Sequence, residues 1–433
     1  MTSSGMTGTV EAAVAARQAD TPERERARAL GRQDALAHLR ARFDLPAGEI
    51  YLDGNSLGAM PKSVPAAINE ALAEGWARDL IRSWNGRDWH NLPVTTGDRL
   101  APLMGARKGE VLAADSTSIN LYKAFCAAMR LRPGRGKVVS ERNNFPTDVH
   151  ILQGAIANVF PEARLVLAED DDQSVLSLLD ADTAVVCLSH VNYRSGRLRD
   201  MATVTKAAHA AGALVIWDLC HSLGALPVDL NACEADFAVG CSYKYMNGGP
   251  GAPAWLFVAA RHLDAAQNPL TGWQGHAAPF GFEIDYRPAA TLEKFRVGTP
   301  PVLSYLPLLE SLAVFEETDM AALRQKSLAL TDFFIALVEA RLAGHGFSLL
   351  TPREHALRGS QVALTHDSGW PIMQALIACG VVGDFRAPDI LRFGFTPLYV
   401  GFEDVWGAVA TLEAIMAGGL WREDRFCERK LVT

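Results

Sequence analysis

The chain has 433 residues, 49% of them apolar, and its 41 basic and 49 acidic side chains give a formal charge of −8. This length allows about two domains with large cores, and the acidic balance excludes the basic surface that nucleic acid or an anionic membrane selects. The chain has no apolar run of the roughly 20 residues that a membrane-spanning helix needs and no signal-peptide pattern at its start, so we expect a cytoplasmic protein.

The N-terminal part of the chain is expected to complete a smaller domain. Residues 1–20 begin with small and polar side chains and are expected to be flexible, and an arginine-rich surface helix is predicted over residues 20–45. The stretch EIYLDGNSLG, residues 49–58, predicts a short strand and a turn, after which Pro61 is placed to begin a helix. We therefore assign residues 21–95 to the N-terminal part of a small domain.

From about residue 110 short apolar runs alternate with amphipathic helical stretches. The runs are KVVSE, RLVLAE, TAVVCLSHV, ALVIWDL, DFAVGCS and AWLFVA. Strands that are apolar on both faces and alternate with helices predict a mostly parallel sheet covered by helices. This is a large α/β domain, which we place at residues 96–310 and whose binding site we expect at the C-terminal ends of the strands.

The remaining residues, 311–433, predict a smaller α+β domain. Its expected elements are a helical region to about residue 344, strands at 347–350, 361–365 and 390–394, and helices at 370–379 and 402–417.

The cysteines predict neither disulfides nor a metal site. They are odd in number, scattered, and without CxxC or Cys/His ligand spacing, and they are typical of small core side chains. Their positions are 126, 187, 220, 233, 241, 379 and 427.

Two neighbouring strand exits carry side chains of unusual chemistry. Asp218 ends the run ALVIWDL and is followed by His221, while the next run leads to Tyr243 and Lys244. Taken alone, Lys244 could be a lysine at a strand end whose ammonium group stays in water, because removing an ammonium from water costs much free energy. A lysine that forms an imine and an acid that holds a protonated ring nitrogen are together what pyridoxal phosphate requires.

A Ser/Thr cluster at a predicted helix start is a candidate phosphate site. The stretch ADSTSINLYKAF, residues 114–125, places hydroxyls and unpaired backbone N–H groups at a helix N-terminus, which attracts anions. The alternative is plain helix capping by Ser116 or Thr117, which needs no ligand.

Eight motifs together resemble the kynureninases, which are fold-type I pyridoxal phosphate enzymes related to aspartate aminotransferase. The motifs occur in the family's order and spacing between about residues 50 and 401, and they are YLDGNSLG, NNFPTD, HVNYRSG, WDLCHSLG, CSYKY, GWQGH, RVGTPP and LRFGFTPLY. The resemblance implies a large domain with a seven-stranded, mostly parallel sheet, pyridoxal 5′-phosphate as cofactor, and a homodimer with active sites at the subunit interface.

The resemblance also implies roles for individual residues at the cofactor. Lys244 would form the imine and Asp218 would hold the ring nitrogen. The other implied cofactor residues are Thr117, Ser118 and Tyr243 at the phosphate, Phe145 stacked on the ring with Asp148 beside it, Ser189 and His221 on the cofactor face, and Trp273 and Thr299 from the other subunit. Several relatives have threonine where this chain has Ser118, which keeps the hydroxyl donor.

For the substrate, the resemblance implies that Arg392 binds the α-carboxylate as a two-bond fork, with Trp84 and Asn55 also in the substrate site. The implied reaction is hydrolysis of the Cβ–Cγ bond of L-kynurenine, or of 3-hydroxykynurenine, to an anthranilate and L-alanine. Lys244 would take the α-proton, and Tyr243 is the candidate for a later proton relay.

Other readings of these residues stay open. Phe145 and Trp273 also fit core aromatics, His221 also fits a turn cap, and Arg392 also fits an internal ion pair with Asp384 or Asp389. The alternative functions are another fold-type I enzyme, either an aminotransferase or a cysteine desulfurase, and a non-catalytic α/β binding protein. A desulfurase needs a mobile catalytic cysteine, whereas the surroundings of Cys379 predict a buried helix end.

Overall fold

The computed structural model describes residues 4–429, and these divide into two compact units. The first unit takes the residues up to Lys62, Arg194–Arg197 and the residues from Val314 onward, and the second takes Ser63–Tyr193 and Leu198–Ala313. No helix in the described range is long and apolar enough to cross a membrane.

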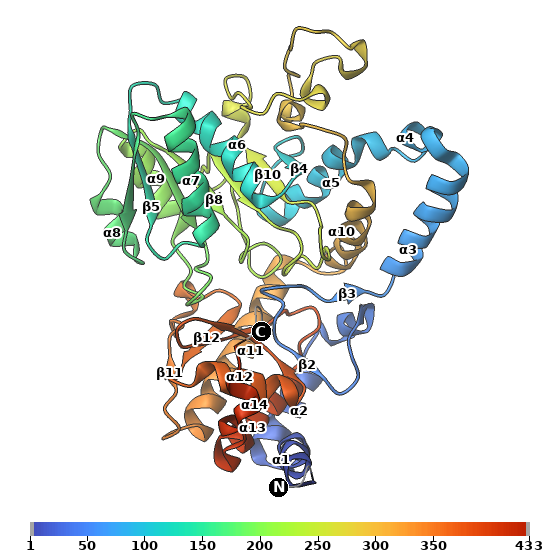
Figure 1. The fold of residues 1–433 in the computed structure, drawn as a ribbon, viewed down its shortest axis with the longest axis vertical. Coiled ribbons are helices and arrows are strands. Elements are labelled where there is room, and N and C mark those ends of the chain that lie inside the picture. Colours follow the sequence, from blue (N-terminus) through green and yellow to red (C-terminus); the bar gives the residue numbers. More distant parts are fainter. Residues whose placement is uncertain (1–3, 430–433) are drawn as a thin grey trace. The chain divides into compact units, whose positions relative to one another are not determined.

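A seven-stranded sheet forms the centre of the second unit among the described residues (Figure 1), in the order β4-β10-β9-β8-β7-β5-β6. Its strands are β4 Val111–Ala113, β5 Lys137–Glu141, β6 Arg164–Ala168, β7 Thr183–Ser189, β8 Leu214–Asp218, β9 Phe237–Gly240 and β10 Trp255–Val258. β10 runs antiparallel to both of its neighbours, and the other pairs are parallel. The predicted mostly parallel α/β sheet is thus confirmed.

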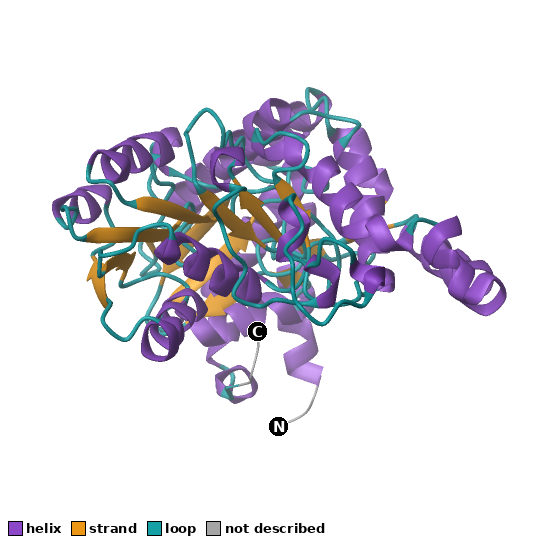
Figure 2. Ribbon diagram, turned by 90° about the horizontal axis from the view of Figure 1, so that it is seen from above, coloured by secondary structure: helices purple, strands orange, loops and turns teal. Residues whose placement is uncertain are grey.

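Helices cover both faces of this sheet, as Figure 2 shows. The helices of this unit are α3 Val64–Glu70, α4 Ser83–Gly86, α5 Leu92–Leu100, α6 Thr117–Arg130, α7 Pro146–Val159, α8 Asp172–Ser177, α9 Met201–Ala210 and α10 Val302–Phe315, which leads out of it. Every residue of β5, β7, β8, β9 and β10 is buried, which explains their apolar runs. Several helices begin where the sequence supplies a cap: Asp171 and Asp200 accept bonds from the N–H groups of Ser174 and Thr203.

The second unit begins before the predicted limit of the large domain. We predicted residues 21–95 for the small domain, whereas the structure places residues from Ser63 onward with the seven-stranded sheet. Helix α5 packs directly on β4, where a Cβ added at Gly97 would lie 2.1 Å from the carbonyl oxygen of Val111. This close approach of two backbones requires glycine.

The first unit joins both ends of the chain. Its strands are β1 Phe43–Asp44, β2 Ile50–Tyr51, β3 Met60–Pro61, β11 Ser348–Leu349, β12 Gln361–Thr365, β13 Val381–Val382, β14 Asp384–Arg386 and β15 Ile390–Gly394. Within the described residues, β11, β12, β15 and β14 form a four-stranded antiparallel sheet, and β2 pairs in parallel with β13. The helices are α1 Ser4–Ala15, α2 Pro22–Arg32, α11 Met320–Arg341, α12 Gly369–Ala378, α13 Phe402–Gly418 and α14 Asp424–Cys427.

The N-terminal segment is more ordered than its composition predicted. Of residues 1–20, which we expected to be flexible, residues 1–3 lie outside the described range. Helix α1 begins at Ser4, and the Arg17 guanidinium donates to the Thr411 hydroxyl at 2.9 Å and to the Gly48 carbonyl at 3.0 Å. Composition alone cannot predict these contacts, because the partners lie far apart in the chain.

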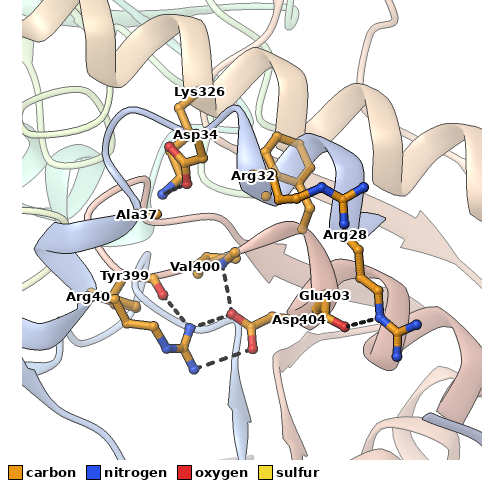
Figure 3. A pocket seen from close by; sticks show the side chains of 13 residues that line it. Arg28, Arg32, Asp34, Ala37, Arg40, Lys326, Tyr399, Val400, Glu403 and Asp404 are labelled. Carbon is orange, nitrogen blue, oxygen red and sulfur yellow. Dashed lines mark hydrogen bonds and ion pairs between the residues drawn. The ribbon is translucent and has the colours of Figure 1, made fainter. Parts of the chain in front are cut away.

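Charged side chains line a cavity of about 650 Å³ in the first unit, shown in Figure 3. Its ion pairs are Lys326 Nζ with Asp34 Oδ2 at 2.7 Å, Arg28 Nε with Glu403 Oε1 at 3.3 Å, and Arg40 with Asp404. Each pair joins the N-terminal segment to α11 or α13. The N-terminal segment and the two helices therefore share the charged lining of this cavity.

Candidate active site

The predicted site residues of the second unit gather at the carboxyl edge of its sheet. β8 ends on Asp218, β7 ends on Ser189, and β9 is followed by Tyr243 and Lys244. Because these three strands are parallel neighbours, their exits open on the same edge.

The amine of Lys244 lies among polar and aromatic groups. Its Nζ is 3.4 Å from Nε2 of His221, 5.9 Å from the centre of the Phe145 ring and 5.8 Å from that of Tyr243. His221 is buried and directed at the lysine, so it does more than cap a turn. The structure thus brings together four of the residues that the sequence nominated.

Two carboxyl groups meet beside this lysine. Asp148, in the first turn of α7, is hydrogen-bonded to Asp218. Burial and the charge of Asp218 raise the pKa of Asp148 well above its ordinary value, which favours the protonated form of this carboxyl group. The Asp148 Oδ2 atom is buried and has no hydrogen-bond partner among residues 4–429. A pair of carboxyl groups that share one proton, with an oxygen left over, fits the protonated nitrogen of a pyridine ring.

Asn144 fixes the loop that carries Phe145, and the sequence alone did not identify it as a site residue. The Asn144 Oδ1 atom accepts hydrogen bonds from the Ser189 hydroxyl and from the Phe145 N–H, both at 2.7 Å. The Phe145 ring is 42% exposed and meets Tyr193 edge to face at 5.2 Å, so it is not a core aromatic. The signal for Asn144 was its place in NNFPTD, directly before a helix that begins with proline.

The candidate phosphate site is the N-terminus of α6. Ser116 caps this helix by accepting a bond from the Ile119 N–H at 3.4 Å, as the capping alternative predicted. Thr117 and Ser118 form the first turn, and the Thr117 hydroxyl lies 3.7 Å from the Cys220 sulfur. The open end of a 14-residue helix therefore adjoins the turn that follows Asp218.

A second cavity, of about 500 Å³, collects Trp84, Trp273 and Thr299. Its other lining residues are Ile81, Asn85, His90, Gln274 and Phe280. Trp273 is 43% exposed, which excludes a core role. The residues that line this cavity include none of the Lys244 cluster.

Arg392, on β15 of the first unit, is buried and paired with a carboxylate. Its Nε donates to Asp384 Oδ1 at 2.7 Å, and its Nη2 donates to Asp384 Oδ2 and, at 3.3 Å, to the Ser56 hydroxyl. The internal ion pair with Asp384 that the sequence left open is therefore present, and Arg386 also contacts Asp384 at 2.8 Å. Two guanidinium groups on one carboxylate leave this cluster positive.

Asn55 and Asp53 lie beside this cluster. Asn55 is 0% exposed, and neither polar atom of its amide has a hydrogen-bond partner within the described chain. Burial and the nearby charge of Asp384 raise the pKa of Asp53 to about 7. A buried amide whose polar atoms lack partners is suited to bind a polar ligand.

No group of three His, Cys, Asp or Glu side chains in the described residues is arranged to hold a metal ion.

Comparison with known proteins gives one consistent family. Residues 323–412 match the model of the kynureninase C-terminal domain. A kynureninase from Burkholderia pseudomallei (strain 1106a) is 52% identical over 414 residues, which cover 95% of this chain and 99% of that protein. A kynureninase from Pseudomonas fluorescens is 48% identical over 409 residues, 94% of this chain and 98% of that protein.

Solved structures share the fold at much lower identity. A mutant of C-DES with glycine covalently linked to the PLP cofactor has a TM-score of 0.74 at 18% identity, covering 86% of this chain and 98% of that one. A cysteine desulfurase from Thermococcus onnurineus NA1 has a TM-score of 0.72 at 17% identity, covering 88% and 98%.

Asp53 should make the stability of the protein depend on pH. Because its pKa in the folded protein lies above that in the unfolded chain, its contribution is fully present below about pH 4 and is lost as the pH rises through 7. The neutral Asp53→Asn variant should therefore unfold with a free energy roughly 2 to 4 kcal/mol higher than the native protein at about pH 8. Urea denaturation measures this gain, which should shrink steadily toward pH 4.

The matched control is Asp44→Asn, at an exposed aspartate of the same unit, which should change stability little at either pH. A gain from Asp53→Asn that is constant with pH would show that Asp53 is ionised in the folded protein.

Proposed function

The chain belongs to the kynureninase family, and from this premise we propose how its residues divide the work of one reaction. The protein is a pyridoxal-phosphate-dependent hydrolase that cleaves the Cβ–Cγ bond of L-kynurenine to give anthranilate and L-alanine. The observation that carries this assignment is the identity of about half of the residues over nearly the full length of two kynureninases. The cysteine desulfurase compared shares only the fold, at 17% identity.

The cofactor residues are proposed on the geometry of the second unit. Bound pyridoxal phosphate supplies an aldehyde that condenses with amines and a ring that stores the electron pair left when the α-proton departs. The ring nitrogen is assigned to Asp218 and Asp148, and the aldehyde to Lys244. The remaining assignments are Thr117, Ser118 and Tyr243 at the phosphate, and Phe145, Ser189 and His221 around the ring.

Lys244 and Tyr243 are the proposed proton carriers. Lys244 Nζ accepts the α-proton of the substrate, and His221, 3.4 Å away, orients the amine for this transfer. The charge of the Cys241 sulfur and burial raise the pKa of Tyr243, so its phenol stays neutral. A neutral phenol can donate its proton to the substrate as the Cβ–Cγ bond breaks, after water has added to the γ-carbonyl.

Arg392 is proposed to bind the substrate α-carboxylate, with Asp384 as the residue that positions it. Asp384 accepts two hydrogen bonds from the guanidinium and so fixes its plane. Arg386 adds a second positive charge, and the unpaired amide of Asn55 offers both a donor and an acceptor.

We further propose a homodimer in which Trp273 and Thr299 of one subunit complete the site of the other. These residues and Trp84 line a cavity separate from the Lys244 cluster. In the same unit α3 and α4 project from the sheet (Figure 1). Large apolar side chains are exposed nearby in the sequence, namely Trp76, Leu80, Ile81, Phe280, Phe282 and Ile284. Exposed apolar groups of this size are typical of an interface.

The Lys244→Ala variant should fold normally, lose the visible absorbance of the lysine-bound cofactor and lose turnover. Borohydride treatment of the native holoenzyme should attach the cofactor mass to the peptide that contains Lys244, as mass spectrometry of the digest would show. Lys206→Ala, at an exposed lysine on α9, is the control and should keep both properties.

Tyr243→Phe separates the two roles of that residue. At saturating cofactor it should keep the absorbance band but slow anthranilate release about 10² to 10⁴-fold. Near-native turnover in this experiment would restrict Tyr243 to phosphate binding.

Arg392→Lys should raise KM for kynurenine roughly 10- to 100-fold, because the two-bond fork is lost, and should leave cofactor affinity unchanged. Steady-state kinetics and a cofactor titration measure the two effects. Arg32→Lys, at an exposed arginine of the same unit, is the control. Weaker cofactor binding with an unchanged KM would assign Arg392 to the cofactor instead.

Subunit complementation tests the shared site. Lys244→Ala and Trp273→Ala, each inactive or nearly so, should recover up to about a quarter of native activity when refolded together, because a hybrid dimer then contains one intact site. A mixture of Lys244→Ala with Asp218→Asn should recover nothing, since both changes fall in the same cluster. No recovery in the first mixture would place Trp273 in the site of its own subunit.

A further inference from the structure

Two thiols lie side by side at the exits of neighbouring strands. Cys220 follows β8 and Cys241 follows β9, and the parallel pairing continues past the strands, with the Leu219 N–H donating to the Val239 carbonyl at 2.8 Å. The Cys241 N–H donates to the Cys220 sulfur at 3.2 Å, and the Cys241 thiol donates to the Cys220 carbonyl at 3.9 Å. Neighbouring strands lie about 4.8 Å apart, within the Cα separation of about 4.4 to 6.8 Å that a disulfide spans.

We propose that Cys220 and Cys241 are a site of reversible oxidation, which hydrogen peroxide or an organic hydroperoxide converts to a disulfide, and that the disulfide weakens cofactor binding. Cys220 is partly exposed, so the oxidant reaches the pair from its side, whereas Cys241 is buried, as are Cys126, Cys187 and Cys379. The proposal modifies the expectation that all the cysteines are inert core side chains.

The surroundings favour a reactive sulfur at this place. Burial acts to raise the pKa of Cys241, but the hydrogen bond with the Cys220 thiol and the charge of Lys244 outweigh it, so the pKa of Cys241 is lowered. The hydrogen bond with Cys241 and burial raise the pKa of Cys220. These opposite shifts favour Cys241 as the nucleophile and Cys220 as the adjacent resolving thiol.

The chemistry balances with one peroxide. The thiolate attacks one peroxide oxygen, the O–O bond breaks, and hydroxide leaves and takes up a proton to become water. The sulfur is now a sulfenic acid. The second thiol attacks this sulfur, the S–O bond breaks, a second water leaves, and the S–S bond forms. Two thiols have lost two electrons and two protons, and hydrogen peroxide has become two molecules of water.

The disulfide would act on the cofactor through the turn after β8. The Cys220 N–H donates to Asp218 Oδ1 at 2.7 Å, and the Cys220 sulfur lies 3.7 Å from the Thr117 hydroxyl. A new S–S bond draws this sulfur away from the Cys241 N–H and from Thr117, and it shifts the turn that bonds Asp218. This consequence rests on the proposed roles of Asp218 and Thr117 at the cofactor.

The test is peroxide treatment of the holoenzyme, with thiol blocking, Asp-N digestion and mass spectrometry without reduction. We expect peptide 218–228 joined to peptide 236–263, about 2 Da lighter than the two thiol peptides together. The dissociation constant of pyridoxal phosphate should rise roughly tenfold and return to its original value with dithiothreitol. Cys220→Ser should form no such link, while Cys233→Ser, at a partly exposed cysteine in the loop between the two strands, should form it normally.

Other outcomes overturn the proposal. A bond to Cys233, or sulfinic acid without a disulfide, would remove the pairing of Cys220 with Cys241. A disulfide with unchanged cofactor affinity would remove the effect on binding. The mapping needs no turnover, so a failure of the reduced protein to hydrolyse kynurenine would count against the proposed catalytic roles and leave the disulfide to be judged separately.

Discussion

The hydrogen bond between Asp148 and Asp218 is the constraint on which the proposed cofactor site depends. Two carboxyl groups in hydrogen-bonding contact cannot both ionise in a buried place, so one keeps its proton. A third buried carboxylate, Glu141, stands close enough to reinforce this effect and is itself paired with Arg199. The two carboxyl groups can therefore bind the ring nitrogen proposed for this place. The charge of Lys244 acts in the opposite direction and lowers the pKa of Asp148, but it does not cancel the increase.

The topology of the sheet explains why buried charged side chains from distant parts of the sequence lie close together. Parallel strands deliver their last residues to one edge, and the helices that follow begin there with unpaired N–H groups. Asp218, Lys244, the start of α6 and the start of α7 are therefore neighbours although more than a hundred residues separate some of them. The two solved structures compared share this fold at 17 to 18% identity, so the fold positions the site, and the side chains at the strand exits decide the chemistry.

The same edge also explains why a redox site can coexist with catalysis. Cys220 and Cys241 lie one or two residues past the ends of neighbouring strands, where the parallel pairing still holds the two chains at the spacing of the sheet. In contrast, Cys379 is buried at the end of α12, as the sequence predicted. A cysteine in this position is not the mobile catalytic cysteine that a desulfurase needs.

The sequence by itself determined the alternation of strands and helices and the α/β class, because strands buried on both sheet faces appear as continuous apolar runs. It also indicated most of the candidate cofactor residues, because the strand exits directly follow those runs. It also raised the ion pair of Arg392 with Asp384, but the choice between that pair and others depended on the register of β14 and β15. Only the tertiary structure decided that residues 63–95 belong to the unit of the seven-stranded sheet and that Arg17 fixes the N-terminal segment. It also decided that Trp84, Trp273 and Thr299 share a cavity whose lining includes none of the Lys244 cluster. Local sequence cannot reveal these features, because each depends on contacts between residues far apart in the chain, and no periodicity or spacing records such contacts.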